Sequence, residues 1–315
     1  LQKLTPRIAE TARVLWLVYL GFTVILATLL LALHASGFAP NMDAFNAISH
    51  AFTTLPTGGF SPQADSIGAF SPAVQWLVIP FLIVAGTNFA LFWFLLNRDV
   101  DLFVGDPEFR TYIGAIVATT AVLAVLLFLG SAPSMRLGGT TAGVFENSLR
   151  QGLFQVIAVV TTTGYASMDF NAWDPSAQTV LLFAYFLGGS AGSAAGSIKI
   201  VRWVLVNKAF LRSLFTSIHP DAVRPVRLGL DAVDEDTVLG VFVFVLLFLG
   251  LFAISTVLLY LDTLRTPDLT LTGLEAMSVA IATLGNVGPG FGPVGPMNSF
   301  LPFSNAGKLY MVFLM

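Results

Sequence analysis

Three short turns in this sequence have the composition expected of a site for a dehydrated monovalent cation. Each has glycine at its centre and follows a segment too short to cross a bilayer; the turns are Thr57-Gly58-Gly59, Thr163-Gly164-Tyr165 and Val287-Gly288-Pro289. Backbone carbonyls can replace the water around such an ion. Glycine suits these turns because it accepts positive φ and keeps the backbone close to the ion. We therefore expect the cation at Gly59, Gly164 and Gly288, with the hydroxyls of Thr57 and Thr163 holding the shape of the loops.

The segments before the turns indicate how they are positioned. Residues 43–54, 145–160 and 273–284 are moderately apolar and predict half-length helices. Such a helix directs its partially negative C-terminal end at the turn, which favours a cation. The three central glycines lie 105 and 124 residues apart, so a unit of span, re-entrant hairpin and span occurs three times. Ordinary glycine turns between membrane helices are the alternative, and they explain one loop better than three matching ones.

The composition places the chain in a membrane. Of its 315 residues, 56% are hydrophobic and 10% are charged, whereas soluble domains carry about 25% charged residues. The net charge of -3 gives no indication of nucleic-acid binding. Cysteine is absent, which excludes disulfides, cysteine-based metal sites and thiol catalysis.

Long apolar stretches predict the membrane spans. They cover residues 14–33, 73–96, 112–129, 177–206 and 238–261, and a sixth run follows Lys308. Without strong alternation of polar and apolar residues, a barrel is not expected. Of the 15 basic residues, 11 fall on one side of these spans, which we interpret as cytoplasmic. The four on the other side are Arg136, Arg150, Arg265 and Lys308.

Both ends of the sequence suggest that it is a piece of a longer protein. It begins at Leu1 rather than methionine, and its last apolar run, 309–315, is too short to cross a bilayer. We treat this as an expectation.

The fourth predicted span is interrupted by small residues. The run 188–197 is followed by a lysine, and each glycine lowers helix propensity by up to about 1 kcal/mol relative to alanine. We expect a movable gate below the three turns, formed by Gly188, Gly189, Gly192, Ser193, Gly196 and Lys199. Two alternatives remain: the small residues could be a face for close helix packing, and Lys199 could extend to the cytoplasmic interface.

Other signals are weaker. Residues 290–295 match GxGxxG but neither follow a strand nor open a helix, so a dinucleotide site is rejected. The three histidines are too scattered for a metal site, and His50 is interpreted as a packed or interfacial side chain. Asp43, Glu146 and Glu275 lie near the starts of the half-helices, where a carboxylate favours the helix N-terminus or attracts cations.

Several of these motifs resemble the Trk/Ktr/HKT superfamily of potassium transporters, and most of all its TrkH membrane subunits. The resemblance rests on residues 52–61, 161–167, 284–290, 188–202 and 219–223, and it extends over essentially the whole chain. It implies an all-α integral membrane protein, multi-pass in the cytoplasmic membrane, in which repeated helix–pore-loop–helix units surround one pore with pseudo-fourfold symmetry. Three of four repeats are then present, over residues 1–98, 99–212 and 213–315.

The resemblance also implies potassium as the transported ion, a homodimer, and a cytoplasmic ring of nucleotide-binding RCK/KTN (TrkA-type) regulatory subunits. The basic segment 199–228 is a docking surface for this ring or only a determinant of topology. No organic cofactor is expected in this chain.

Three functions follow as hypotheses. The first is gated potassium uptake through a selectivity filter made of the three turns. The second is potassium uptake coupled to sodium or protons, which requires an additional ion site. The third is an intramembrane enzyme, which requires a pair of catalytic side chains that the predicted spans lack.

Overall fold

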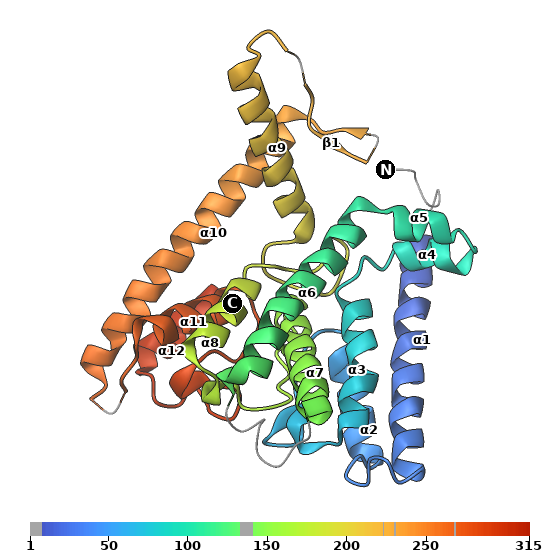
Figure 1. The fold of residues 1–315 in the computed structure, drawn as a ribbon, viewed down its shortest axis with the longest axis vertical. Helices are drawn as coiled ribbons and strands as arrows, with labels where there is room; N and C mark the ends of the chain where they lie inside the picture. The colour runs from blue at the N-terminus through green and yellow to red at the C-terminus, as the bar shows by residue number, and fades with distance from the viewer. Residues whose placement is uncertain (1–7, 133–140, 223, 230, 268) are drawn as a thin grey trace.

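Helices make up most of the chain in this computed structural model, which describes residues 8–132, 141–222, 224–229, 231–267 and 269–315 (Figure 1). The α-helices are α1 (Ile8–Ala35), α2 (Ala44–Thr54), α3 (Pro72–Ala85), α4 (Leu91–Leu96), α5 (Val100–Gly105), α6 (Pro107–Leu126), α7 (Thr141–Val160), α8 (Pro175–Ala184), α9 (Ile200–Ile218), α10 (Glu235–Asp262), α11 (Gly273–Leu284) and α12 (Asn305–Leu314). Two short antiparallel strands, β1 (Arg227–Leu228) and β2 (Asp231–Ala232), form a hairpin. The predicted all-α class is confirmed.

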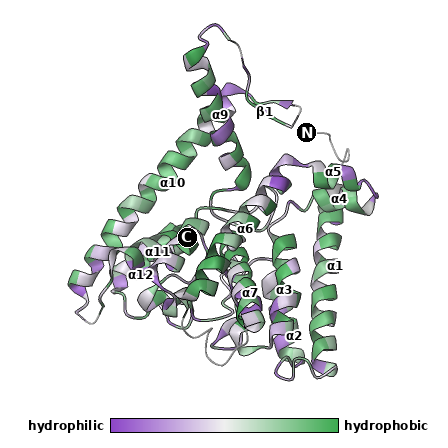
Figure 2. Cartoon of the chain, in the orientation of Figure 1, coloured by the Kyte–Doolittle hydropathy of each residue, from purple (hydrophilic) through white to green (hydrophobic). Residues whose placement is uncertain are grey.

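Among the described residues, three helices are long and apolar enough to cross a membrane: Ala12–Ala35 in α1, Pro107–Gly130 beginning with α6, and Glu235–Arg265 beginning with α10. Large apolar side chains on α1 and α10 are exposed, as lipid-facing helices require (Figure 2). The other two complete predicted spans are not continuous helices. Residues 73–96 are divided into α3 and α4, and residues 177–206 are divided into α8 and α9.

The ends of these elements agree with the charge asymmetry. An arm formed by α9 with β1 and β2 forms the top of the molecule in Figure 1, and the α4–α5 corner and the start of α6 lie below it, above α1 and α3. The lower end carries the end of α10, beside Arg265. Lys3, Arg7 and Arg136 lie outside the described residues. Arg150, one of the basic residues predicted on the outer side, is buried inside the protein and only 5% exposed.

The three half-helices are α2, α7 and α11. Asp43 caps α2 by accepting the N–H of Asn46 at 2.8 Å, and Thr272 and Glu275 form a capping box on α11. The remaining half-helix, α7, is longer than predicted: it begins at Thr141 and has 20 residues. Glu146 therefore lies inside it and does not cap it; its carboxylate pairs with Arg150 at 2.8 Å.

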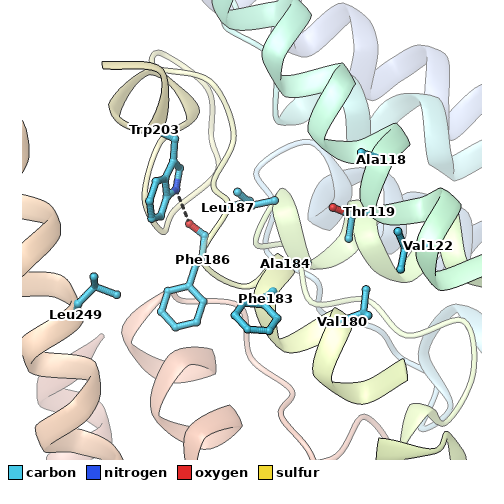
Figure 3. A pocket seen from close by; sticks show the side chains of 10 residues that line it. All are labelled: Ala118, Thr119, Val122, Val180, Phe183, Ala184, Phe186, Leu187, Trp203 and Leu249. Atoms are coloured by element: carbon cyan, nitrogen blue, oxygen red, sulfur yellow. Dashed lines mark hydrogen bonds between the residues drawn. The ribbon is translucent and has the colours of Figure 1, made fainter. Parts of the chain in front are cut away.

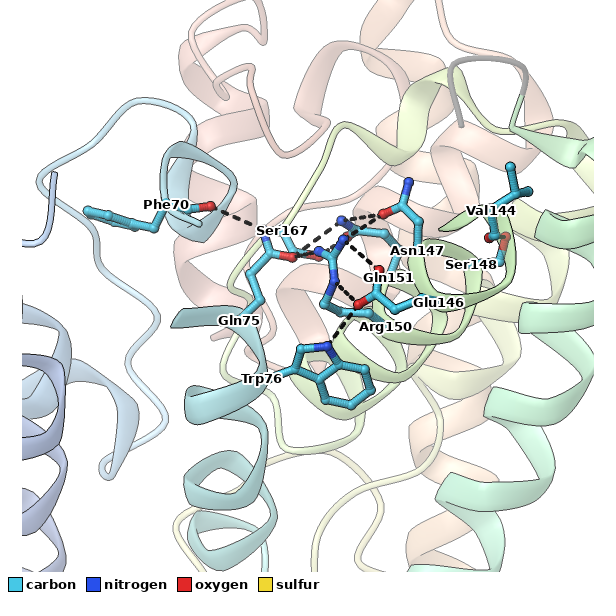
Figure 4. Close-up of polar contacts among 10 residues, drawn as sticks. All are labelled: Phe70, Gln75, Trp76, Val144, Glu146, Asn147, Ser148, Arg150, Gln151 and Ser167. Carbon is cyan, nitrogen blue, oxygen red and sulfur yellow. Dashed lines mark hydrogen bonds and ion pairs between the residues drawn. The ribbon is translucent and has the colours of Figure 1, made fainter. Parts of the chain in front are cut away.

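A buried polar network explains why α7 tolerates so many polar residues (Figure 4). The Arg150 guanidinium donates to Gln75 on α3, to Glu146 and to Asn147. Gln151 also donates to Gln75, and it accepts from the hydroxyl of Ser167, which follows the second glycine turn. The network therefore fastens α7 to α3 and to the chain beyond the turn.

Replacing Arg150 by methionine should destabilise the protein. The substitution removes the central donor from the buried acceptor on Gln75 and from the half-buried acceptor on Asn147, at a cost of about 2 kcal/mol. We expect a lower midpoint of thermal unfolding in detergent. Arg110→Met, at an exposed arginine of α6, is the control and should leave the midpoint unchanged. Equal midpoints for the two variants would contradict the role given to the network.

Candidate functional site

The three glycine turns have the same backbone hydrogen bonds. In the first, Thr57 N–H donates to Thr54 O, and the N–H groups of Gly58 and Gly59 share Thr53 O, at 2.9 to 3.1 Å. The other two repeat this pattern. Thr162, Thr163 and Gly164 donate to Val159 and Ala158, and Asn286, Val287 and Gly288 donate to Thr283 and Ala282, at 2.9 to 3.3 Å. Each turn is thus fastened to the end of its own half-helix.

Backbone dihedrals show the same correspondence. Positive φ occurs at Gly59, Gly164 and Gly288, with values of 66°, 74° and 106°, as glycine turns require. It also occurs two residues earlier in each turn, at Thr57, Thr162 and Asn286. Thr57 therefore corresponds to Thr162, and Thr163 corresponds to Gly58 and Val287.

The carbonyls of the turns are left free. Within the described chain, no hydrogen bond is accepted by the carbonyls of the nine residues Thr57, Gly58, Gly59, Thr162, Thr163, Gly164, Asn286, Val287 and Gly288. Their N–H groups are all bonded to the half-helices. Four of the nine residues, Thr57, Thr162, Thr163 and Val287, are buried, where carbonyls without partners are uncommon. This one-sided arrangement presents oxygen, the partially negative end of the peptide, to any ion.

The glycines also allow the turns to pack against one another. A Cβ on Gly59 would overlap the carbonyl oxygen of Thr163, and a Cβ on Gly164 would overlap that of Val287. Each of these two glycines thus lies against the residue before the next central glycine. Nothing lies within 4 Å of the corresponding position on Gly288.

Two buried tyrosines fasten the turns to neighbouring segments. Tyr165 directs its hydroxyl away from the turn to α2, where it lies 2.6 Å from the Thr53 hydroxyl and donates to His50 O at 3.2 Å. Tyr185, after α8, donates to the carbonyl of Pro289 at 2.6 Å. Each side chain therefore stabilises the position of a turn by a hydrogen bond.

His50 is a packed side chain, as predicted. Its Nδ1 lies 2.7 Å from the carbonyl of Asn46 and its Nε2 lies 3.0 Å from the hydroxyl of Ser61. This buried Ser–His contact was not expected from the sequence. It connects the chain after the first turn to α2.

The run 188–197 is not helical, so the interpretation as a helix-packing face is wrong. We name residues 188–199 the intramembrane loop. Its two ends pair with each other, since Gly188 N–H donates to Ile198 O at 2.8 Å and Ile200 N–H donates to Gly189 O at 3.1 Å. The loop is thus a closed structure rather than a slack linker.

The intramembrane loop pairs with the break between α3 and α4. Ser190 donates to Gly86 O, Ala194 donates to Ala85 O, and Phe89 donates to Gly192 O, at 2.8 to 3.3 Å. Non-helical backbone at membrane depth needs such partners inside the protein. The two broken helices therefore satisfy each other.

The intramembrane loop also contacts the glycine turns. Thr57 donates its hydroxyl to Ala194 O at 3.3 Å, and the Thr162 hydroxyl accepts the N–H of Gly196 at 2.7 Å. A Cβ on Gly196 would lie 2.8 Å from the carbonyl oxygen of Gly285, so the third turn is close as well. The loop lies directly against the bases of the turns.

Lys199 bonds to the intramembrane loop instead of extending away from it. Its ammonium group donates to the carbonyls of Ser193 and Ala195. Just after the loop, Trp203 donates to Phe186 O at 2.9 Å and so joins α9 to the end of α8 (Figure 3). An apolar cavity of about 630 Å³ between α6, α8, α9 and α10 borders this contact.

Two buried carboxylates were missed in the sequence. Glu108 is 8% exposed and its Oε1 accepts the N–H groups of Ala191 at 2.6 Å and Val201 at 3.3 Å. Asp262 is 7% exposed and accepts from the backbone and hydroxyl of Ser304. Each stands at the end of an apolar segment, where a carboxylate is normally interpreted as a helix cap or a solvated charge.

Comparisons with known proteins place this arrangement in a family. Residues 2–315 match the family model TrkH, described as cation transport protein. The Trk system potassium uptake protein TrkH of Escherichia coli K12 is 35% identical over 294 residues, covering 93% of this chain and 56% of the relative. The protein of the same name from Vibrio parahaemolyticus is 34% identical over 304 residues, with the same coverage.

Among solved structures, the crystal structure of the potassium transporter TrkH from Vibrio parahaemolyticus is similar, with a TM-score of 0.78 and 31% identity. The alignment covers 100% of this chain and 63% of that one. The chain thus spans just over half the length of the curated relatives it matches. By sequence and by fold, it belongs to the TrkH family of cation transport proteins.

Proposed function

We propose that this chain forms part of a potassium-uptake pore in the cytoplasmic membrane. The observation that carries the proposal is the set of three matching turns whose N–H groups are bonded and whose carbonyls are free. Such carbonyls can replace the hydration shell of potassium. The similar proteins from Escherichia coli and Vibrio parahaemolyticus are named as potassium uptake proteins, which supports the choice of ion.

In this proposal potassium binds at Gly59, Gly164 and Gly288, with the residues that flank them in each turn. The C-terminal ends of α2, α7 and α11 lead directly into the turns, and their partial negative charge favours a cation. Side chains take little part. Tyr165 is directed to α2, and the carbonyl of Pro289 is already bonded to Tyr185.

The intramembrane loop is the proposed gate. It lies against the bases of the turns through Thr57 and Thr162, so its position and theirs are linked. Its glycines fit places where a side chain would collide: a Cβ on Gly188 would lie 2.5 Å from Gly196 O, and one on Gly189 would lie 2.7 Å from Gly86 O. In this proposal, the gate opens only when the hydrogen bonds between the loop and the side chains of Thr57 and Thr162 break together.

The pore works, in this proposal, within a larger assembly. The relatives are named as parts of a Trk system, which supports a protein of several components. We propose a homodimer that carries a ring of nucleotide-binding RCK/KTN (TrkA-type) subunits on its cytoplasmic face. The arm is a suitable docking place, because a cleft on it is lined by Lys208, Arg212, Arg224 and Arg227. The boundaries of the pore repeats, at residues 98 and 212, also remain proposals.

Replacing Gly164 by serine should reduce the preference for potassium over sodium. The new Cβ would overlap the carbonyl of Val287, at a backbone φ of 74° that L-residues rarely adopt, so the ring of carbonyls must shift. The full-length protein is expressed in a bacterium lacking potassium uptake, and growth on limiting potassium and uptake of both ions are measured. Gly114→Ala, at a glycine of α6 with nothing within 4 Å, is the control. Unchanged selectivity in Gly164→Ser would refute the filter.

Deleting residues 192–194 should increase the potassium leak through the full-length protein. The deletion removes Phe89–Gly192, Ala85–Ala194 and Thr57–Ala194 hydrogen bonds, which hold the intramembrane loop under the turns. Current is measured in planar bilayers, and size-exclusion chromatography checks that the variant is folded. A folded variant with the same leak as the unaltered protein would contradict the gate.

Ion gradients distinguish passive uptake from coupled uptake. The buried carboxylates Glu108 and Asp262 both accept hydrogen bonds from the protein, so each has a role in holding the fold. We expect the reversal potential of the full-length protein to follow the potassium gradient alone. A reversal potential that also follows sodium or proton gradients would favour the symporter.

A further inference from the structure

We propose that Glu108 is the latch of the intramembrane loop: its carboxylate holds the loop under the turns, and loss of its charge releases it. The inference rests on the proposed function of the loop as a gate. It concerns a residue of α6, a different helix from the one that the loop interrupts.

The first observation is the pair of hydrogen bonds made by one oxygen. Glu108 Oε1 accepts from Ala191, near the start of the intramembrane loop, and from Val201, just beyond its end. The same atom therefore joins both ends of the loop. Val201 lies in the first turn of α9, where backbone N–H groups have no partner within the helix. The carboxylate also stands at the positive end of that helix.

The second observation is that Glu108 is not needed as the cap of its own helix. A carboxylate in the first turn of a helix is normally interpreted as a cap, but α6 already has one. Asp106 is the N-cap residue and accepts the N–H of Phe109 at 2.7 Å. The Glu108 carboxylate is 8% exposed and makes its hydrogen bonds to the loop and α9. Burying a charged group is costly unless it is paired or hydrogen-bonded, and here the loop provides the bonds.

The third observation is the opposite charge on the intramembrane loop. Lys199, at the end of the loop, carries the charge opposite to that of Glu108, and its ammonium group donates to the carbonyls of Ser193 and Ala195. The carboxylate thus binds N–H groups at the ends of the loop, while the ammonium binds carbonyls in its middle. Together they satisfy backbone N–H groups and backbone carbonyls that have no hydrogen-bond partner within a helix.

The latch acts at a distance from the ion path. Glu108 contacts Ala191 and Val201, and the same loop reaches the turns through Ala194 and Gly196. Glu108 is therefore a positioning residue: it fixes where the loop lies, and the loop meets the turns. Its loss should alter gating without altering which ion is selected.

The test compares Glu108→Gln with Asp106→Asn in the full-length protein. Glutamine keeps the size of the side chain and removes its charge, and a hydrogen bond to a charged group contributes about 1.5 kcal/mol or more. We expect the potassium leak in planar bilayers to rise about tenfold in Glu108→Gln. The potassium-to-sodium preference should stay unchanged. Asp106→Asn makes the same chemical change two residues away, keeps a good N-cap residue, and should leave the leak unchanged.

Further variants distinguish failure of the latch proposal from failure of the gate proposal. Glu108→Asp keeps the charge on a shorter side chain and should recover part of the low leak, whereas a role in packing alone predicts that aspartate is worse than glutamine. If deletion of 192–194 raises the leak and Glu108→Gln does not, the latch is wrong and the gate stands. If neither raises it, both are wrong. If Glu108→Gln changes selectivity as much as leak, Glu108 acts on the turns and the latch is also wrong.

Discussion

Backbone that leaves a helix inside the membrane must find hydrogen-bond partners within the protein, and the centre of this molecule is organised by that requirement. It is met in two different ways. At the three glycine turns the N–H groups return to the half-helices, while the carbonyls are left free for an ion. At the two broken helices, N–H groups and carbonyls of one break bind those of the other. The first arrangement creates a place for a cation, and the second closes the backbone around it.

The two arrangements touch each other through side chains of the turns. Thr57 and Thr162 occupy the same place in their turns, both with positive φ, and both hydroxyls reach the intramembrane loop. A side chain at this position thus connects its own turn to the intramembrane loop. In the third turn the corresponding residue, Asn286, donates to the carbonyl of Met315 instead. The intramembrane loop is therefore fastened to two of the three turns by their side chains.

Few charges lie inside the protein, and those that do hold helices or loops in place. Arg150 fastens α7 to α3 behind the second turn, and Glu108 fastens α6 to the intramembrane loop. In each case a buried charge is surrounded by hydrogen-bonding groups from separate segments. Because such a charge loses much of its stabilisation when one partner moves, it favours a single arrangement of those segments.

Patterns that are local in the chain were readable from the sequence. Apolar stretches indicated α1, α6 and α10, and the basic residues indicated which ends face the cytoplasm. Gly59, Gly164 and Gly288 were identifiable because each needs positive φ immediately after a half-helix, a property of a few neighbouring residues. The family was recognisable for the same reason. The sequence also indicated an interruption at 188–197, but its composition was equally compatible with a packed helix face.

Contacts between distant segments were decided only by the tertiary structure. Glu108 and Ala191 are 83 residues apart, and Gln75 and Arg150 are 75 apart, so no spacing rule connects them. The equivalence of Thr57 with Thr162 became visible only from the hydrogen bonds and dihedrals of the turns. Helices and turns follow from near neighbours, whereas the partner of a buried charge or a broken helix depends on which distant segment packing brings beside it. That is why the sequence determined where the three glycine turns are, and the tertiary structure decided what holds them.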